Sequence, residues 1–282
     1  MRTKRWPALA LTLALVLCLG VACRQTPEPT VDLGDIGSRA NSPRERICIN
    51  CSDDSYMRHG GRLQFYSDNL ATETLRLDGA LGRLGVYSGG TETARLGGTD
   101  ALQLYGDGTV WEDLRVPLER GKTAGSNVPT YEQWADDGNS SSGVYAYSFD
   151  DDDEIWLTVQ MPHGWKTAST IYPHVHWMAE GDASTKNVGL GLEYIWSSIG
   201  ETITTTTIVT RNVAGDTAYN HEITGLPASG IAGTGEGLSS ILAVRLYREA
   251  AASDNYTGGI YILEFDVHYE IDALGSREIT TK

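Results

Sequence analysis

Apolar and polar residues alternate along most of the second half of this chain, as they do in a β-strand with one buried face. The alternation runs through "EIWLTVQM" (154–161), "VGLGLEYIW" (188–196) and "ILAVRLYRE" (241–249). The predicted core positions in the first two segments are Ile155, Leu157, Val159, Met161, Val188, Leu190, Leu192, Tyr194 and Trp196. Because no segment carries a sustained helical repeat, the pattern predicts an all-β fold.

The segment "GIYILEFDVHYEID" (259–272) alternates most regularly. One face of this strand is predicted to face the core with Tyr261, Leu263, Phe265, Val267 and Tyr269. The opposite face is predicted to point outward with Glu264, Asp266, His268 and Glu270. Strands of this number and spacing predict a jelly-roll-like β-sandwich over residues 118–282.

The segments at 63–77, 84–96 and 102–116 repeat one another at a step of about twenty residues. The alignment superposes Tyr66, Tyr87 and Tyr105, and likewise Arg76, Arg95 and Arg115. Each unit has two short strands and a turn, which predicts a β-hairpin repeat region over residues 61–117. A hairpin cannot bury an apolar face alone, so neighbours must stack or several chains must intertwine. An ordinary meander of regular appearance is the alternative.

The N-terminus has the pattern of an export signal. Arg2, Lys4 and Arg5 precede a short apolar stretch, and small residues follow it, so residues 1–22 are predicted to be a signal peptide. Cys23 is then a candidate for lipidation, although Gly20 stands where a lipoprotein signal usually has leucine. Residues 23–60 are predicted to be a flexible tether because the segment after the signal is polar and contains proline and glycine.

Export would place the chain in oxidising surroundings, where cysteines pair. Cys18 would leave with the signal, and Cys48 and Cys51 form "CINC". Without a second cysteine pair a zinc site lacks ligands, so Cys48 and Cys51 are predicted to form a disulfide, local or between chains.

Charge limits the partners. The net charge is −15, and removing the three basic residues of the signal changes it to −18. Such an acidic chain is not expected to bind nucleic acid or an anionic membrane, apart from a lipid anchor at Cys23.

Three segments of the predicted sandwich are distinctive: "VQMPHGWKTASTIYPHVHW", "GLEYIW" and "FDVHYEIDALGSREITTK". Together with the hairpin repeats and "WEDLRVPL" before them, they resemble bacteriophage virion structural proteins of the tail-fibre-like type. The resemblance covers residues 63–282. It implies a trimeric or polymeric structural role and a C-terminal β-sandwich that binds a surface, and it implies no catalytic residues. Virion proteins normally lack an export signal, so a cell-surface or filament-forming relative is an open alternative to a virion protein.

"HVHWMAE" is the main candidate for chemistry, and three interpretations are open. His174, His176 and Glu180 have the His-x-His-x3-Glu spacing of a cupin-like metalloenzyme, but the rest of that motif is missing. Alternatively, His174 and His176 share one strand face and bind a transition metal between subunits. In the third interpretation Val175 and Trp177 pack inward, and the histidines meet solvent or neighbouring strands.

The acidic run Asp150, Asp151, Asp152 and Asp153 is a candidate calcium site, or a solvated turn before a strand. No nucleophile elbow, His-Glu-x-x-His motif or phosphate-binding loop is found in the sequence, so no enzyme activity is predicted. Several tryptophans, at 134, 156, 165, 177 and 196, offer either a sugar-binding surface or core packing.

Together these features predict an exported, non-enzymatic structural protein at the cell surface or outside the cell, or in a virion. Its main partner is expected to be itself, as a homotrimer or polymer in a fibre or filament. A carbohydrate-binding adhesin module and a cupin-like metalloenzyme are the alternatives. No cofactor is predicted, apart from calcium or a transition metal at the sites named above.

Overall fold

The computed structural model describes residues 46–50, 55–58, 62–66, 73–78, 81–97, 100–138, 142–250 and 254–282. The predicted signal peptide, Cys23, Cys51 and the side chain of Cys48 lie outside the described residues, so lipidation and the disulfide stay predictions. Within the described ranges, no helix has the length and apolar composition needed to cross a membrane.

The C-terminal region is a jelly roll. One sheet has the strand order β15 (Glu222–Gly225), β12 (Tyr172–Ala179), β17 (Ile260–Ile271), β10 (Gly143–Phe149). The other sheet has the order β11 (Glu154–Gln160), β16 (Ile241–Arg248), β13 (Asn187–Ser197), β14 (Thr207–Ala214). From β10 to β17 the chain changes sheet at every connection except that between β13 and β14. Eight antiparallel strands in this order form a jelly roll, which confirms the predicted fold.

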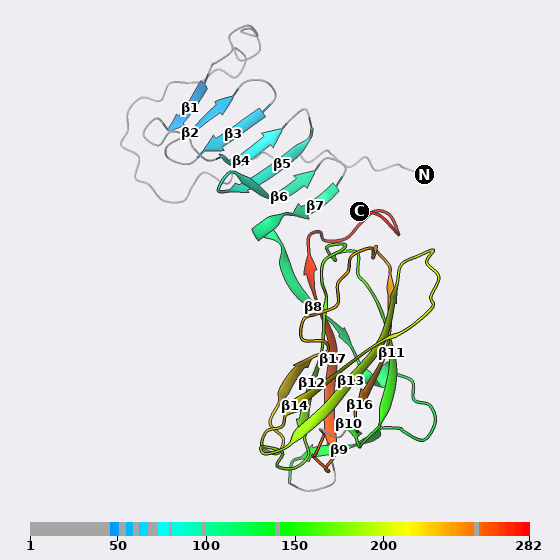
Figure 1. Cartoon of the computed structure of the whole chain (residues 1–282). Coiled ribbons are helices and arrows are strands. Elements are labelled where there is room, and N and C mark those ends of the chain that lie inside the picture. The colour runs from blue at the N-terminus through cyan, green and yellow to red at the C-terminus, as the bar shows by residue number, and fades with distance from the viewer. Residues whose placement is uncertain are drawn as a thin grey trace, which may run out of the picture. The chain divides into compact units, whose positions relative to one another are not determined.

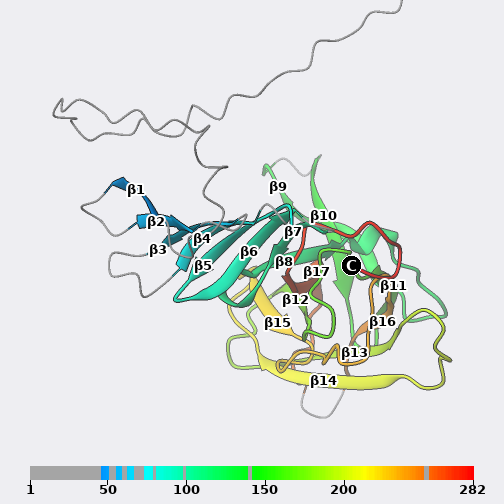
Figure 2. The same ribbon diagram turned by 90° about the horizontal axis from the view of Figure 1, so that it is seen from above.

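Two further strands extend the first sheet, which we call the β12 sheet (Figures 1 and 2). β9 (Thr130–Asp136) pairs with β10, and β8 (Val110–Val116) pairs with β17. The sequence places β8 in the third hairpin repeat, but the structure gives it to the sandwich. Short 3-10 helices, η2 (Gly106–Gly108) and η3 (Leu118–Arg120), flank β8.

The core lies between the two sheets, as period-two alternation requires. The predicted inward residues of β11 and the first three of β13 are all buried, and Tyr194 and Trp196 pack against them. From the β12 sheet, Val175, Trp177 and Phe265 are at most 1% exposed. Both sheets therefore bury one apolar face against the other.

A β-bulge in β17 changes the predicted pattern. His176 pairs with Glu264 and Trp177 pairs with Ile262, so Leu263 is an extra residue without a partner in the ladder. The prediction that Tyr261 and Leu263 face the core is wrong, because the extra residue reverses the alternation before it. Ile260 and Ile262 face the core instead, and Tyr261 packs outside it with Met178. The predicted inward positions after the bulge, Phe265, Val267 and Tyr269, are confirmed.

The repeat region forms a single-layer antiparallel meander (Figure 1). Its strands are β3 (Arg62–Tyr66), β4 (Glu73–Asp78), β5 (Arg83–Ser88), β6 (Thr91–Gly97) and β7 (Asp100–Leu104). The turn between β5 and β6 uses Gly89 and Gly90 with φ of 57° and 83°, as a two-residue hairpin turn demands. A separate pair, β1 (Arg46–Asn50) and β2 (Ser55–Arg58), lies within the range predicted to be a tether.

Replacing Trp177 by alanine tests the inward assignment of β12. Trp177 is 1% exposed and its indole N–H donates to Thr224 Oγ1 at 3.0 Å, so the variant is expected to lose about 3–5 kcal/mol of unfolding free energy. Trp111→Ala is the matched control, since Trp111 is 45% exposed, and should cost less than about 1 kcal/mol. Urea unfolding followed by circular dichroism measures both. Equal losses would contradict the assignment.

Candidate metal centre and neighbouring surfaces

The outer face of the β12 sheet carries four histidines and several carboxylates. Tyr172, His174 and His176 point outward from β12 because Val175 and Trp177 point into the core. In the ladder with β17, His174 lies opposite Asp266 and His176 lies opposite Glu264. The structure therefore places Val175 and Trp177 in the core and both histidines on the outer face, an orientation that is compatible with metal binding as well as with its absence.

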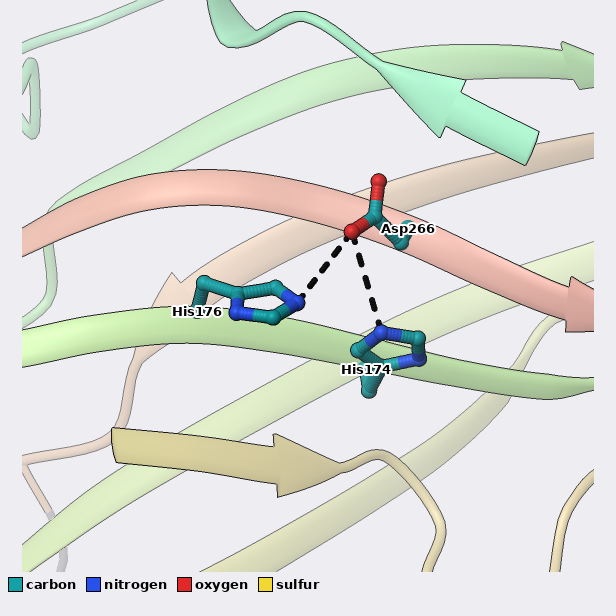
Figure 3. Close-up of side chains that lie close together, drawn as sticks. All are labelled: His174, His176 and Asp266. Carbon is teal, nitrogen blue, oxygen red and sulfur yellow. Dashed lines mark ion pairs between the residues drawn. The ribbon is translucent and has the colours of Figure 1, made fainter. Parts of the chain in front are cut away.

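His174, His176 and Asp266 converge on one point, and we call them the His–Asp cluster. Figure 3 shows both imidazoles of β12 directed at the same carboxylate oxygen from β17. His176 Nε2 lies 3.2 Å from Asp266 Oδ2, and His174 Nε2 lies 3.7 Å from it. One ligand atom from each of the three residues lies within 4.8 Å of the others, and in the described part of the chain this is the only such group of three.

Hydrogen bonds behind the cluster orient both rings. His174 Nδ1 lies 3.1 Å from the carbonyl oxygen of Tyr172, which can only accept, so Nδ1 carries the hydrogen. In the neutral ring the lone pair is then on Nε2 and points at Asp266. His176 Nδ1 lies 2.8 Å from Nε2 of His221, a residue just before β15. Each imidazole is therefore held from behind with Nε2 towards the cluster.

Burial shifts the pKa of His176 and that of Asp266 in opposite directions. His174 and Asp266 are 9% and 5% exposed. Burial lowers the pKa of His176, and the nearby charge of Asp266 opposes this shift. Burial also raises the pKa of Asp266, Glu264 adds to the shift, and the two histidines oppose it. Asp266 Oδ1 and Glu264 Oε1 are buried without a hydrogen-bond partner among the described residues.

β8, which pairs with β17, contributes further neighbours of the cluster. His268 Nδ1 lies 2.7 Å from Asp113 Oδ1, and its ring stacks on Trp111 with centroids 5.1 Å apart. Arg115 donates to Glu264 at 2.7 Å, while most of its own side chain remains exposed. The cluster thus lies between a histidine–tryptophan stack and an arginine–glutamate pair.

The structure does not assemble the predicted cupin-like set. Glu180 is exposed and lies beyond the end of β12 at Ala179, and the carboxylate that reaches the histidines is Asp266. The histidines also face away from the sandwich interior, whereas a cupin binds its metal inside a barrel. The alternation in the sequence predicts that Asp266 lies on the outer face, but it does not predict that Asp266 is a neighbour of His174, because only the pairing of β12 with β17 brings them together.

The acidic run 150–153 has a structural role. It forms the turn between β10 and β11, in which Asp150 N–H donates to Asp153 Oδ2 at 2.9 Å. Asp151 forms an ion pair with Arg248, whose side chain is 1% exposed and also pairs with Asp254 at 3.2 Å. Within the described ranges these aspartates do not form a metal-compatible group. Asp151 of the turn helps to neutralise a buried arginine, and calcium binding at this run stays a prediction.

A groove of about 310 Å³ lies beside residues 156–160 of β11 and is bordered by β8 and η3. Its lining includes Trp156 and three basic residues, Arg115, Arg120 and Lys122. Lys122 is fixed by two backbone hydrogen bonds with Trp156, of 2.9 and 2.8 Å. Neither Arg120 nor Lys122 forms a side-chain ion pair with another described residue. The groove is a positive site on an acidic protein.

The aligned tyrosines and arginines of the repeats form a ladder on one face of the repeat sheet. Arg76 pairs with Glu73 and lies over the ring of Tyr87, 5.0 Å from its centroid. Arg95 pairs with Glu92 and lies over Tyr105 at the same distance. The third arginine, Arg115, departs from this pattern because β8 pairs with β17 in the sandwich.

The opposite face of the repeat sheet is apolar, and we call it the leucine face. The register aligns Leu77, Leu84, Leu96 and Leu102 in one row and Leu75, Val86, Ala94 and Leu104 in the next. Leu77, Val86 and Leu96 are 40%, 41% and 54% exposed. Among the described residues no second sheet covers this face.

Comparison with known proteins gives weak similarities. No protein-family model and no curated protein matches the chain. A carbohydrate-binding module of family 22 from Clostridium thermocellum Xyn10B is 12% identical, with a TM-score of 0.31 over 58% of this chain and 95% of that one. TmCBM61, solved in complex with β-1,4-galactotriose, is 15% identical, with a TM-score of 0.24 over 57% of this chain and 88% of that one.

A structure of infectious bursal disease virus, strain Gx, is 11% identical, with a TM-score of 0.29 over 76% of this chain and 46% of that one. At TM-scores this low, neither the ligands nor the roles of these proteins can be assigned to this chain. The fold assignment rests on the strand order.

The pKa of His176 gives a test of the site without metal. Because burial lowers it, an NMR titration in a chelator-containing buffer should find the His176 midpoint below its ordinary value of 6.5. A histidine that titrates lower when folded than unfolded makes the protein less stable as pH falls from 6.5 through the folded pKa. The unfolding free energy of the native protein should therefore fall more steeply over this range than that of His176→Gln.

Asp266 acts with the opposite sign, because its raised pKa adds stability at low pH that is lost as pH rises. Removing His176 also removes one of the charges that oppose the rise in the Asp266 pKa, which adds to the difference between the two slopes in the same direction. Identical slopes together with a midpoint above 6.5 would contradict the described environment.

Proposed function

We propose that this chain is an exported, non-enzymatic structural protein whose repeat sheets associate with other copies of the same chain. The association would present the jelly roll at the cell surface, as a closed oligomer or as the subunit of a fibre or filament. The exposed leucine face of the repeat sheet is the observation that carries the proposal.

An isolated sheet with an apolar face is not stable in water. Each buried leucine contributes about 1.5–3 kcal/mol, and this contribution is absent while the side chain stays hydrated. The jelly roll meets the requirement internally, because its two sheets cover each other. The repeat sheet has rows of apolar side chains on one face and charged and aromatic side chains on the other. Burial of its apolar rows therefore requires contact with another protein surface.

A second copy is the partner that the charges favour. Residues 62–104 contain four arginines and five acidic residues, a net charge of −1, whereas the whole chain carries −15. Repulsion between copies is therefore weak in this region. Because successive hairpins present the same apolar rows, the face is complementary to itself, as a symmetric assembly requires.

Light scattering coupled to size exclusion tests this proposal. The chain without its signal is expected to elute at a multiple of the monomer mass. Val86→Glu combined with Leu96→Glu should shift it to monomer, because each change removes apolar burial and adds an unpaired carboxylate. Leu274→Glu is the matched control, since Leu274 is 79% exposed outside the leucine face. A wild-type protein that stays monomeric at micromolar concentration would overturn the proposal.

The positive groove favours a second candidate function, binding of an acidic glycan. Its volume lies at the small end of the range for ligand sites. Trp156 offers an aromatic surface for the apolar face of a sugar ring, and Arg120 and Lys122 offer donors for a carboxylate or sulfate.

Binding to uronic-acid or sulfated oligosaccharides, compared with their neutral counterparts, tests this second candidate. Trp156→Ala should weaken binding about tenfold or more. Arg120→Ala with Lys122→Ala should remove the preference for acidic sugars and its dependence on salt. Trp111→Ala is the control, because Trp111 is exposed but outside the groove. Equal binding of neutral and acidic sugars, or no binding, would exclude this function.

A further inference from the structure

We propose that His174, His176 and Asp266 of a single chain bind one divalent transition-metal ion of the zinc class. This proposal does not rest on the proposed self-association or on glycan binding in the groove. It differs from a metal shared between subunits, because all three ligands come from β12 and β17 of the same chain.

The donor spacing fits such an ion. Ligands at about 2.0–2.2 Å from a tetrahedral zinc lie about 3.3–3.6 Å from one another. The two imidazole nitrogens lie 3.2 and 3.7 Å from Asp266 Oδ2, and the three ligand atoms lie within 4.8 Å of one another, so side-chain rotations can complete the geometry. Two nitrogens and one carboxylate oxygen favour zinc, cobalt, nickel or copper over calcium or magnesium, which prefer all-oxygen sites.

The hydrogen bonds behind the rings are those that metal-binding histidines use. The Tyr172 carbonyl accepts from His174 Nδ1, which leaves Nε2 free to coordinate. His221 can accept from His176 Nδ1 in the same way. Such outer partners fix the tautomer and the ring orientation, and they raise the basicity of the ligating nitrogen.

Two buried carboxylate oxygens supply an independent observation. Asp266 Oδ1 and Glu264 Oε1 have no hydrogen-bond partner among the described residues. The side chains of both residues are largely buried, and of the two only Glu264 has an arginine beside it, at 2.7 Å. An unpaired buried charge is costly. A dication at the cluster would offset the charge of Asp266 and reduce its repulsion with Glu264.

The site is open on one side. Three protein ligands leave a fourth position of a tetrahedral ion for water or another ligand. The side chain of His176 is 26% exposed, so an ion reaches the cluster from solvent. Binding would cross-link β12 to β17, whose hydrogen-bonded ladder already joins the two sides of the site.

Zinc and cobalt titrations of chelator-treated protein test the site. The protein must lack a polyhistidine tag, and the readouts are calorimetric stoichiometry, the melting temperature and the visible spectrum of Co²⁺. We expect one ion per chain, a higher melting temperature with zinc, and the visible absorption of tetrahedral Co²⁺. His176→Gln and Asp266→Asn should each weaken zinc binding about tenfold or more, and His221→Phe should weaken it less.

His163→Gln is the matched control. His163 contacts Ser239 and Ser276 rather than the cluster, so zinc binding should not change. His174→Gln provides a third ligand variant if either of the first two fails to fold. Absence of zinc binding, binding that survives all the ligand variants, or one ion per two or three chains would overturn the proposal.

Discussion

A β-sheet with an apolar face needs a second layer over that face, and this requirement organises the whole described structure. In the jelly roll the chain supplies both layers, because seven connections carry it between eight strands and all but one of them change sheet. Trp177, Phe265 and Leu190 from the two sheets are then at most 1% exposed. In the repeat sheet the chain supplies one layer within the described residues, and Leu96 remains 54% exposed. The proposed self-association follows from this difference.

The same requirement creates the His–Asp cluster. Because Val175 and Trp177 must point inward, His174 and His176 must point outward and share a face. The neighbouring strands β8 and β17 place their own outward side chains over the same area, so polar groups that would be hydrated on a lone strand become buried. Asp266, at 5% exposed, is the clearest example. Buried, oriented and incompletely hydrogen-bonded groups are what a metal ion stabilises.

Period-two alternation in the sequence was enough to predict the jelly-roll-like sandwich and most of its inward positions. Local pattern could not predict the bulge at Leu263, because a bulge depends on the partner strand, and Tyr261 was therefore assigned to the wrong face. It also could not predict that Asp266 lies opposite His174, since ninety-two residues separate them. The burial of Arg248 was also not predicted, because one of the groups that satisfy it, the carbonyl oxygen of Phe149, is 99 residues away in the sequence, although Asp254 and Gly258 are close.

The repeats show the limit of sequence similarity most directly. Arg76, Arg95 and Arg115 occupy equivalent positions, yet only the first two stack on a tyrosine of the next repeat. The third pairs with Glu264, because its strand has joined the sandwich. A repeated pattern therefore predicts the strand, while the layer that the strand joins is decided by tertiary pairing. The relation to tail-fibre-like proteins stays a prediction.

The central claim is that copies of this chain cover one another's leucine faces. Hydroxyl-radical footprinting over a range of protein concentrations tests it residue by residue. We predict that Leu77, Val86 and Leu96 become protected as concentration rises, while Leu274 stays equally reactive throughout. Modification of Leu77, Val86 and Leu96 at the rate of Leu274 at every concentration would contradict the account.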